Sequence, residues 1–222
     1  TKTVTMPELA AAVRSNWKGR EELQRRARRA APKWGNNDER ADRFAKRVFA
    51  AATARINGTE NGHGGYYQAG LWSIYLDMDF GAKTGATPDG RSRGETLSRN
   101  NVATAGCGTE GPLALMLSNL KLDQAEAPDG HIMDLLLPTS LKRSPNGAAQ
   151  VADVIRTYFA QGGQCLHLNC FDAAMLREAL AHPEKYSDLQ VRVCGWNVRW
   201  NDLSKAEQLH FIKTAEAQEE RN

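Results

Sequence analysis

The chain has 222 residues, a length that suits one large domain or two small ones and allows a sizeable core. A hydrophobic content of 41% and a charged content of 25% are ordinary globular values, and a net charge of +3 gives no reason to expect nucleic acid or a membrane surface as a partner. No apolar run approaches the roughly 18 residues that span a bilayer. The first eight residues lack the apolar stretch of a signal peptide, so we expect a cytoplasmic protein.

The cysteines form neither a CxxC pair nor a zinc-ribbon spacing. A secreted disulfide scaffold would be shorter or richer in cysteine. We interpret most of them as buried, reduced thiols; they are Cys107, Cys165, Cys170 and Cys194. His63 and His131 are predicted to lie in loops without a carboxylate at metal-ligand spacing, so we predict no metal site.

The first predicted segment, residues 1–56, is helical. Thr5 and Glu8 have the spacing of a capping box, which predicts a helix start. Pro32 ends this helical stretch, and a second helix begins near Asp38 with apolar residues at helical spacing. Two arginine pairs in this segment could indicate RNA binding. No aromatic residues for base stacking are interleaved with them, so a solvated helix face is the better interpretation.

The second predicted segment, residues 57–161, is first rich in glycine and then helical. Up to residue 111, glycines and turn signals predict long connections, and the aromatic residues among them favour an ordered, functional region. Residues 112–120 and 148–161 read as helices, and Gly162 and Gly163 end the second one.

The third predicted segment, residues 162–222, alternates strand and helix patterns. Residues 166–171 read as a strand, and Asp172 is the expected N-cap of the next helix. Ser204 and Glu207 form a second capping box, which opens the last helix. Strands that alternate with helices indicate an α/β protein built from parallel strands.

Gly195 lies between two of these strand patterns. Residues 189–193 alternate as a strand that leads into Gly195, and residues 197–200 have strand character. Taken alone, such a glycine more often marks a bulge or a close packing contact.

Motifs spread over nearly the whole chain are more specific than this single glycine. In chain order they are Ala31-Pro32-Lys33-Trp34-Gly35-Asn36-Asn37-Asp38, Gly85-Ala86-Thr87-Pro88-Asp89-Gly90-Arg91, Gly162-Gly163 with Asn169, Asp172 and Leu176, His182-Pro183-Glu184-Lys185-Tyr186, Leu189-Gln190-Val191-Arg192-Val193-Cys194-Gly195-Trp196, and Leu203-Ser204-Lys205 with Gln208. Together they resemble the C-terminal portion of the pyruvate formate-lyase-like glycyl radical enzymes, including their glycyl radical domain.

The resemblance implies the C-terminal part of a ten-stranded α/β barrel with an N-terminal helical segment, in which a glycine loop and a cysteine loop meet at the centre. It implies that Gly195 stores the radical, within a loop motif made by Arg192, Val193, Cys194 and Trp196. No cofactor is bound in this family. Instead, a radical-SAM activating enzyme, using an iron–sulfur cluster and S-adenosylmethionine, removes one hydrogen from the glycine Cα. The radical then converts a cysteine into a thiyl, which abstracts hydrogen from a small organic substrate.

The chemistry of glycine agrees with this role. Because glycine has no Cβ, its Cα radical can be planar and delocalised between the amide nitrogen and the carbonyl group. The missing side chain also allows another backbone and a cysteine sulfur to come very close.

Two residues depart from the family pattern. Trp196 stands where tyrosine is common, and Cys194 stands where alanine or serine is common. A thiol beside a stored radical could quench it. Because neighbouring side chains of a strand point to opposite faces, we predict that the Cys194 sulfur is directed away from the Cα of Gly195.

No cysteine of the chain has the position expected for the thiyl residue, which in this family lies well upstream. Cys107 follows the Thr87–Arg91 loop and resembles a different family loop, so we interpret it as a structural or pocket-lining thiol. We therefore expect the chain to be the C-terminal portion of a longer enzyme.

Four polar residues are further candidates for a substrate pocket, each with a structural alternative. Asp89 and Arg91 lie in a turn and could be either structural or substrate contacts. His167 and Asn169 share one face of their strand, which could be the barrel interior, although satisfied buried polar residues explain them equally well.

The leading hypothesis is therefore a radical lyase that catalyses bond cleavage, elimination or decarboxylation of a small molecule. We expect an anaerobic, oxygen-sensitive, cytoplasmic homodimer whose partner is the activating enzyme, with neither nucleic acid nor membrane as a partner. The alternative is a non-catalytic glycyl radical helper or replacement subunit for a related enzyme. This chain extends further upstream than such a minimal domain would need, which disfavours the alternative.

Overall fold

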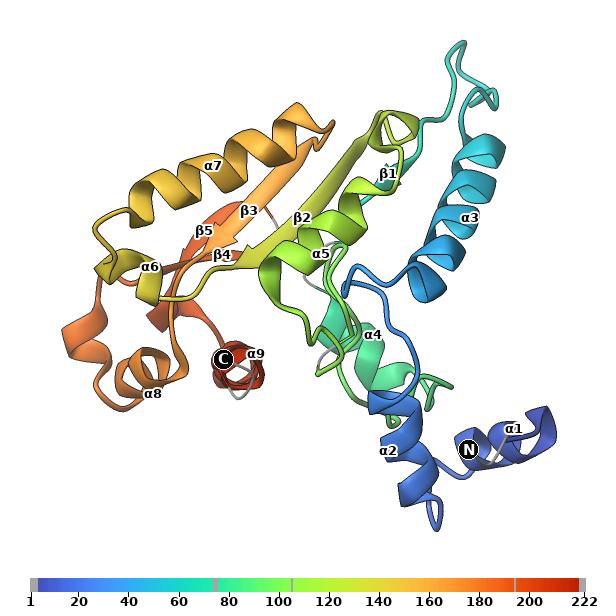
Figure 1. Ribbon diagram of the computed structural model, residues 1–222, viewed down its shortest axis with the longest axis horizontal. Helices are drawn as coiled ribbons and strands as arrows, with labels where there is room; N and C mark the ends of the chain where they lie inside the picture. The colour runs from blue at the N-terminus through green and yellow to red at the C-terminus, as the bar shows by residue number, and fades with distance from the viewer. Residues whose placement is uncertain (1–3, 74–75, 105, 194, 220–222) are drawn as a thin grey trace.

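The protein has a mixed α/β architecture with two separate sets of strands (Figure 1). The structure, a computed structural model, describes residues 4–73, 76–104, 106–193 and 195–219. One sheet is parallel and has the strand order β1 (Gly70–Leu71), β2 (Gly130–Leu136), β3 (Cys165–Asn169). The other strands, β4 (Gln190–Val193) and β5 (Trp196–Arg199), pair antiparallel. The prediction of parallel strands is thus confirmed for the first sheet and wrong for β4 and β5.

Helices surround these strands. They are α1 (Met6–Arg14), α2 (Glu21–Arg29), α3 (Glu39–Ile56), α4 (Asp77–Lys83), α5 (Gly111–Leu120), α6 (Ser140–Arg143), α7 (Gly147–Ala160), α8 (Ala173–Ala181) and α9 (Lys205–Glu219), with 3₁₀ turns at Gln124–Glu126, Pro183–Tyr186 and Trp200–Asp202. The predicted capping boxes at Thr5 and Ser204 and the predicted N-cap at Asp172 are confirmed by side-chain hydrogen bonds to the first turns. The helix predicted to begin near Asp38 begins at Glu39, and the Asp38 side chain caps it. Among the described residues, no helix is both long and apolar enough to cross a membrane.

Helices α5 and α7 pack on one face of the parallel sheet (Figure 1). Met116 of α5 and Tyr158 of α7 form one apolar cluster with Met133 and Leu135 of β2. The side chains of β2 alternate between partly and fully buried, as expected for a strand with two different faces. The opposite face of β2, which includes Asp134, is therefore left for polar contacts described below.

His131 lies in β2, in the same row as Met133 and Leu135, so its predicted loop position is wrong. Its side chain is fully buried and meets the ring of Phe49 in α3 edge to face, with ring centroids 6.2 Å apart. Neither ring nitrogen has a hydrogen-bond partner. Burial lowers the pKa of His131 to about 4, because the charged imidazolium cannot be solvated there.

The N-terminal helical stretch breaks earlier than predicted. Helix α1 ends at Arg14, and Asn16 and Trp17 adopt left-handed backbone angles, with φ of 54° and 65°. Trp17 is thereby turned inward, is 1% exposed, and donates its indole N–H to the carbonyl oxygen of Arg91 at 3.2 Å. A tertiary contact thus interrupts a sequence that could continue as helix.

Candidate functional site

Gly195 lies in the two-residue connection between β4 and β5. Val193 pairs with Trp196 across the strands, so these two residues close a tight hairpin. Gly195 has φ of +103°, in the region that L side chains rarely adopt. Two-residue hairpin connections require positive φ, which explains the glycine here without reference to chemistry.

The surroundings of Gly195 are open. A Cβ built on Gly195 would meet no other described atom within 4 Å, apart from its chain neighbours. Trp196 beside it is 55% exposed. The expected close approach of another backbone and a cysteine sulfur is therefore not made by the described part of this chain. Cys194 lies outside the described residues, and the predicted direction of its sulfur stays a prediction.

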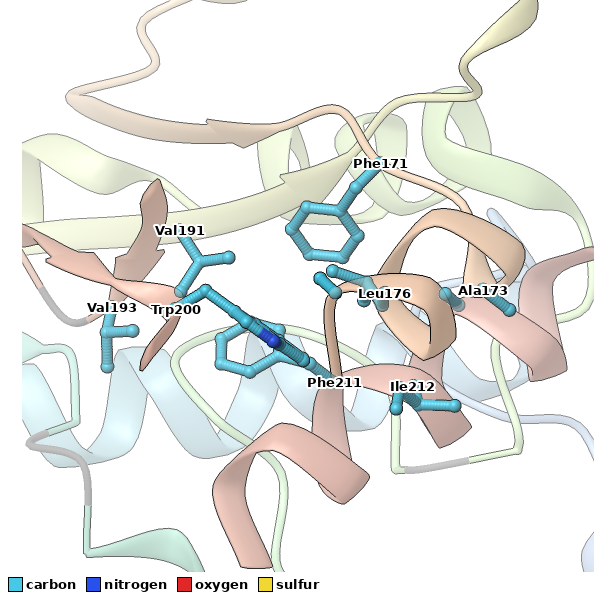
Figure 2. Packing of buried hydrophobic residues seen from close by; sticks show 10 residues of the cluster. Phe171, Ala173, Leu176, Val191, Val193, Trp200, Phe211 and Ile212 are labelled. Carbon is cyan, nitrogen blue, oxygen red and sulfur yellow. The ribbon is translucent and has the colours of Figure 1, made fainter. Parts of the chain in front are cut away.

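One face of the hairpin, in contrast, is firmly packed (Figure 2). Val191 and Val193 are 1% and 4% exposed and belong to one apolar cluster with Trp200 and Phe211. The ring of Phe211, in α9, meets the Trp200 ring at 6.3 Å between centroids. A packed face and an exposed tip are what a hairpin needs to present one backbone position to another part of a protein.

A cavity of about 780 Å³ lies beside this hairpin, between β4, α9 and the loop of residues 93–108. Its charged lining side chains are mostly cationic: Arg28, Arg93, Arg99, Arg192 and Lys213, against Glu95 and Asp134. The lining thus carries an excess of positive formal charge, with Arg28 paired to Glu95 and Arg99 paired to Asp77. A smaller cavity of about 300 Å³, lined in part by Trp34 and Cys107, includes no hairpin residue, so we take the larger cavity as the candidate pocket.

Arg99 ties the cavity loop to the C-terminal helix. Its guanidinium binds the buried carboxylate of Asp77, with Nη2 and Oδ1 2.9 Å apart, and lies 5.8 Å from the ring centre of Phe211 in α9. His210 also lines the cavity, and burial together with the charge of Arg99 lowers the pKa of His210. Its imidazole is thereby kept neutral over a wider pH range.

Asn169 and Arg192, both predicted from sequence, line this cavity and contact each other. The Asn169 side chain accepts from the Arg192 backbone N–H at 2.8 Å and donates to the Arg192 carbonyl oxygen at 3.1 Å. His167 lies on the same strand, is 4% exposed, and has its Nδ1 2.9 Å from Oδ1 of Asp134. The other oxygen of Asp134 accepts from the Asn100 side chain at 2.8 Å.

Sequence reasoning missed several of these residues. Strand β2, which carries Asp134, was not predicted, although a Pro-Asp-Gly turn signal followed by an apolar run is typical of a buried strand. Arg99 lies in the cavity loop, whereas His210 and Lys213 lie in α9, far along the chain. No local pattern marks them, because only the tertiary fold brings them to one cavity.

Two family profiles match the chain. The profile described as pyruvate formate lyase-like matches residues 1–81, and the profile described as glycine radical matches residues 97–201, which include the β4–β5 hairpin. The chain belongs to the glycyl radical enzyme family. Membership in this family implies a radical modification on a glycine. It also confirms the family resemblance drawn from the sequence motifs.

Curated glycyl radical relatives match nearly the whole chain. Indoleacetate decarboxylase of Tractidigestivibacter scatoligenes is 36% identical over 83% of this chain and 21% of its own length. Trans-4-hydroxy-L-proline dehydratase of Clostridioides difficile is 30% identical over 97% of this chain and 27% of its own length. The chain thus spans about a fifth to a quarter of the curated relatives it matches.

Solved glycyl radical enzymes have the same fold as the described chain. The B12-independent glycerol dehydratase from Clostridium butyricum is 34% identical and superposes with a TM-score of 0.87, over 95% of this chain and 27% of that one. A glycyl radical enzyme from Archaeoglobus fulgidus is 30% identical with a TM-score of 0.88, over 96% of this chain and 27% of its own. The predicted fold class, part of the α/β barrel of this family, is confirmed.

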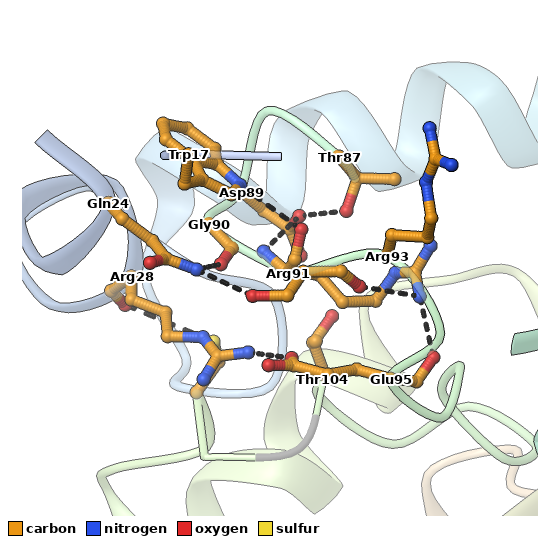
Figure 3. Close-up of polar contacts among 12 residues, drawn as sticks. Trp17, Gln24, Arg28, Thr87, Asp89, Gly90, Arg91, Arg93, Glu95 and Thr104 are labelled. Atoms are coloured by element: carbon orange, nitrogen blue, oxygen red, sulfur yellow. Dashed lines mark hydrogen bonds and ion pairs between the residues drawn. The ribbon is translucent and has the colours of Figure 1, made fainter. Parts of the chain in front are cut away.

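The loop around Asp89 and Arg91 fastens the N-terminal helices of this glycyl radical chain (Figure 3). Arg91 is 2% exposed, and its guanidinium donates to the backbone carbonyl oxygens of Gly85, Ser92 and Glu95. Asp89 accepts from the Thr87 hydroxyl and the Arg91 N–H. Neither Asp89 nor Arg91 lines the larger cavity, and a role in substrate binding stays an untested prediction.

We expect Gly90→Ala to lower the free energy of unfolding by about 2–3 kcal/mol. Gly90 has φ of +100°, and a Cβ there would lie 3.0 Å from the Gln24 carbonyl oxygen and 3.1 Å from the Arg28 nitrogen, both in the backbone of α2. Gly94→Ala is the matched control, since Gly94 has φ of +81° but open space around its Cβ position. Denaturant unfolding of both variants checks this; an equal loss in both would show that the packing on α2 contributes nothing.

The described cysteines do not line the candidate pocket, although Cys107 stands between two lining residues, Gly106 and Gly108. Cys107 is 2% exposed, with its sulfur 3.9 Å from the Arg28 carbonyl oxygen. Cys165 begins β3, Cys170 follows it, and both are free, partly buried thiols. Burial raises the pKa of Cys165, which keeps it protonated. None of these three lines the larger cavity.

Proposed function

We propose that Gly195 is the glycine that stores the radical. The observation that carries this proposal is its position: it lies in the turn of a hairpin with one packed face, inside the matched glycine radical region, with open space where a side chain would stand. An exposed backbone position is accessible to a second protein, which supports removal of its hydrogen by an activating enzyme. We propose that this enzyme is of the radical-SAM type, with an iron–sulfur cluster and S-adenosylmethionine.

The proposed activity of the whole protein is that of a radical lyase. The glycyl radical takes a hydrogen atom from a cysteine thiol, which regenerates glycine and leaves a thiyl radical. The thiyl radical then takes a hydrogen atom from a small organic substrate, which undergoes bond cleavage, elimination or decarboxylation. The names of the relatives, which include dehydratases and a decarboxylase, support this range of reactions.

The thiyl cysteine is proposed to come from a region outside this chain. The described cysteines line neither the hairpin turn nor the larger cavity, which supports this assignment. Matches to both family profiles argue against a minimal replacement subunit. The predicted homodimer and the cytoplasmic location stay predictions.

Electron paramagnetic resonance (EPR) tests the proposal directly. The protein, expressed with the region that carries the cysteine loop, is activated without oxygen by its activating enzyme and S-adenosylmethionine. We expect a doublet, because one hydrogen remains on the Gly195 Cα and couples to the unpaired electron. Incorporation of glycine deuterated at Cα should collapse the doublet. A folded protein that gives no radical signal after activation would contradict the proposal.

A further inference from the structure

Asn169 joins the two sets of strands close to the turn of the hairpin. It is the last residue of β3, and its side-chain amide binds both backbone groups of Arg192 in β4, at 2.8 Å and 3.1 Å. The ladder of the parallel sheet ends at β3, and β4 pairs with β5. Among the described residues, β3 and β4 form no backbone ladder, and the Asn169 side chain supplies hydrogen bonds between them instead.

The geometry explains why asparagine suits this position. In an antiparallel pair, the backbone groups of alternate residues point away from the partner strand. Those of Arg192, which stands opposite Asn197, point toward β3 and would be left unpaired without a partner there. A carboxamide presents one donor and one acceptor side by side, as a peptide group does, and therefore satisfies both.

We propose that Asn169 is a positioning residue for the radical hairpin. Arg192 lies three residues before Gly195, and a Cβ built on Gly195 would meet no described atom within 4 Å apart from its chain neighbours. The position of the Gly195 Cα relative to the parallel sheet is therefore set by the contacts of β4. Hydrogen atom transfer to and from this carbon depends on fixed geometry, since small displacements of reacting atoms cost large factors in rate. This inference rests on the proposed role of Gly195.

Substitutions of nearly unchanged shape provide the test. Asn169→Asp keeps an acceptor for the Arg192 N–H but places a second anionic oxygen against the Arg192 carbonyl. We expect backbone amide exchange in the hairpin to be about 30-fold faster at neutral pH, because one hydrogen bond of ordinary net strength is lost and the new carboxylate oxygen repels the Arg192 carbonyl oxygen. The Arg192 carbonyl oxygen disfavours the charged form of the introduced carboxyl, whereas the Arg192 N–H and the cationic side chains of the cavity favour it. The pH dependence of hairpin exchange in this variant therefore reports the pKa of the carboxyl.

Recovery of hairpin protection at low pH separates a hydrogen-bonding role of residue 169 from a general packing role. Once the pH is low enough to protonate the introduced carboxyl, the Asn169→Asp variant can donate to the Arg192 carbonyl as asparagine does, so hairpin protection should return toward the wild-type value. Asn169→Ala should lose protection at both pH values. Asn201→Asp is the matched control, since Asn201 donates to the Pro183 carbonyl oxygen at 2.9 Å, away from β4.

The same variants are then activated at neutral pH and measured by EPR. We expect the radical content per chain to fall at least about fivefold in both Asn169 variants and to stay at the wild-type level in Asn201→Asp. Three results would each overturn the inference. They are an unchanged rate of hairpin amide exchange in the Asn169 variants, no return of protection at low pH in Asn169→Asp, and a wild-type radical content in the Asn169 variants. If the wild type itself gives no doublet, the proposed function fails, while the exchange experiment still decides whether Asn169 holds β4.

Discussion

Replacing Gly195 by alanine is expected to remove the EPR doublet of the activated protein completely, while the fold is kept. A methyl group on Cα opposes the planar arrangement of a backbone radical and obstructs hydrogen removal. The cost in folding is smaller: φ of +103° is unfavourable for alanine by about 1–2 kcal/mol, and the space around the Cβ position is open. Loss of the signal should therefore occur in a protein whose circular dichroism and melting temperature remain close to wild type.

Gly162→Ala is the matched control for this experiment. Gly162 has φ of +91°, also with open space around its Cβ position, and lies just after α7. The backbone penalty is thus comparable, but no radical role is proposed for it. We expect both variants to lose similar stability and only Gly195→Ala to lose the doublet. A doublet that survives in Gly195→Ala would place the radical on another residue.

Local features of this fold could be predicted from sequence because their causes lie within a few residues. The side chains of Thr5, Ser204 and Asp172 each bind a backbone N–H within the next three residues, so spacing alone identifies the helix starts. The strand pattern on both sides of Gly195 is equally local.

Features that depend on distant contacts could not be predicted in this way. The break at Trp17 is stabilised by an indole hydrogen bond to Arg91, a residue 74 positions away. The antiparallel direction of β4 and β5 follows from their two-residue connection, which is too short for a parallel crossover. This short spacing is visible in the sequence, but the alternation of strands and helices along the chain led to the prediction of parallel strands.

The candidate pocket also depends on contacts between distant parts of the chain. Asn169 and Arg192 could be singled out from motifs, but their mutual hydrogen bonds could not, because they join strands 23 residues apart. Asp134, Arg99 and His210 become neighbours of the hairpin only once α9 packs back on the 93–108 loop.

Acidification is expected to destabilise the protein through His131, by up to about 3 kcal/mol. In the folded protein this imidazole is fully buried and has a pKa of about 4, whereas in the unfolded chain it takes a proton near its ordinary pKa of about 6.5. Protons are therefore bound preferentially by the unfolded state between these values. The contribution of the neutral His131 side chain to the free energy of unfolding is fully present above about pH 6.5. It declines as the pH falls toward about 4 and levels off below that.

His131→Leu isolates this effect. Leucine has a similar volume, suits the apolar surroundings of Phe49 and Met133, and removes two ring nitrogens that lack hydrogen-bond partners. Unfolding by denaturant, followed from above pH 6.5 down to about pH 4, should show a growing stability advantage of the variant as the pH falls. Carboxylates elsewhere contribute equally to both proteins, so the difference between the two curves reports His131 alone. If the two unfolding free energies differ by the same amount across this range, the imidazole is charged, or reaches a proton acceptor, inside the folded protein. The contact between β2 and α3 would then be less apolar than its packing indicates.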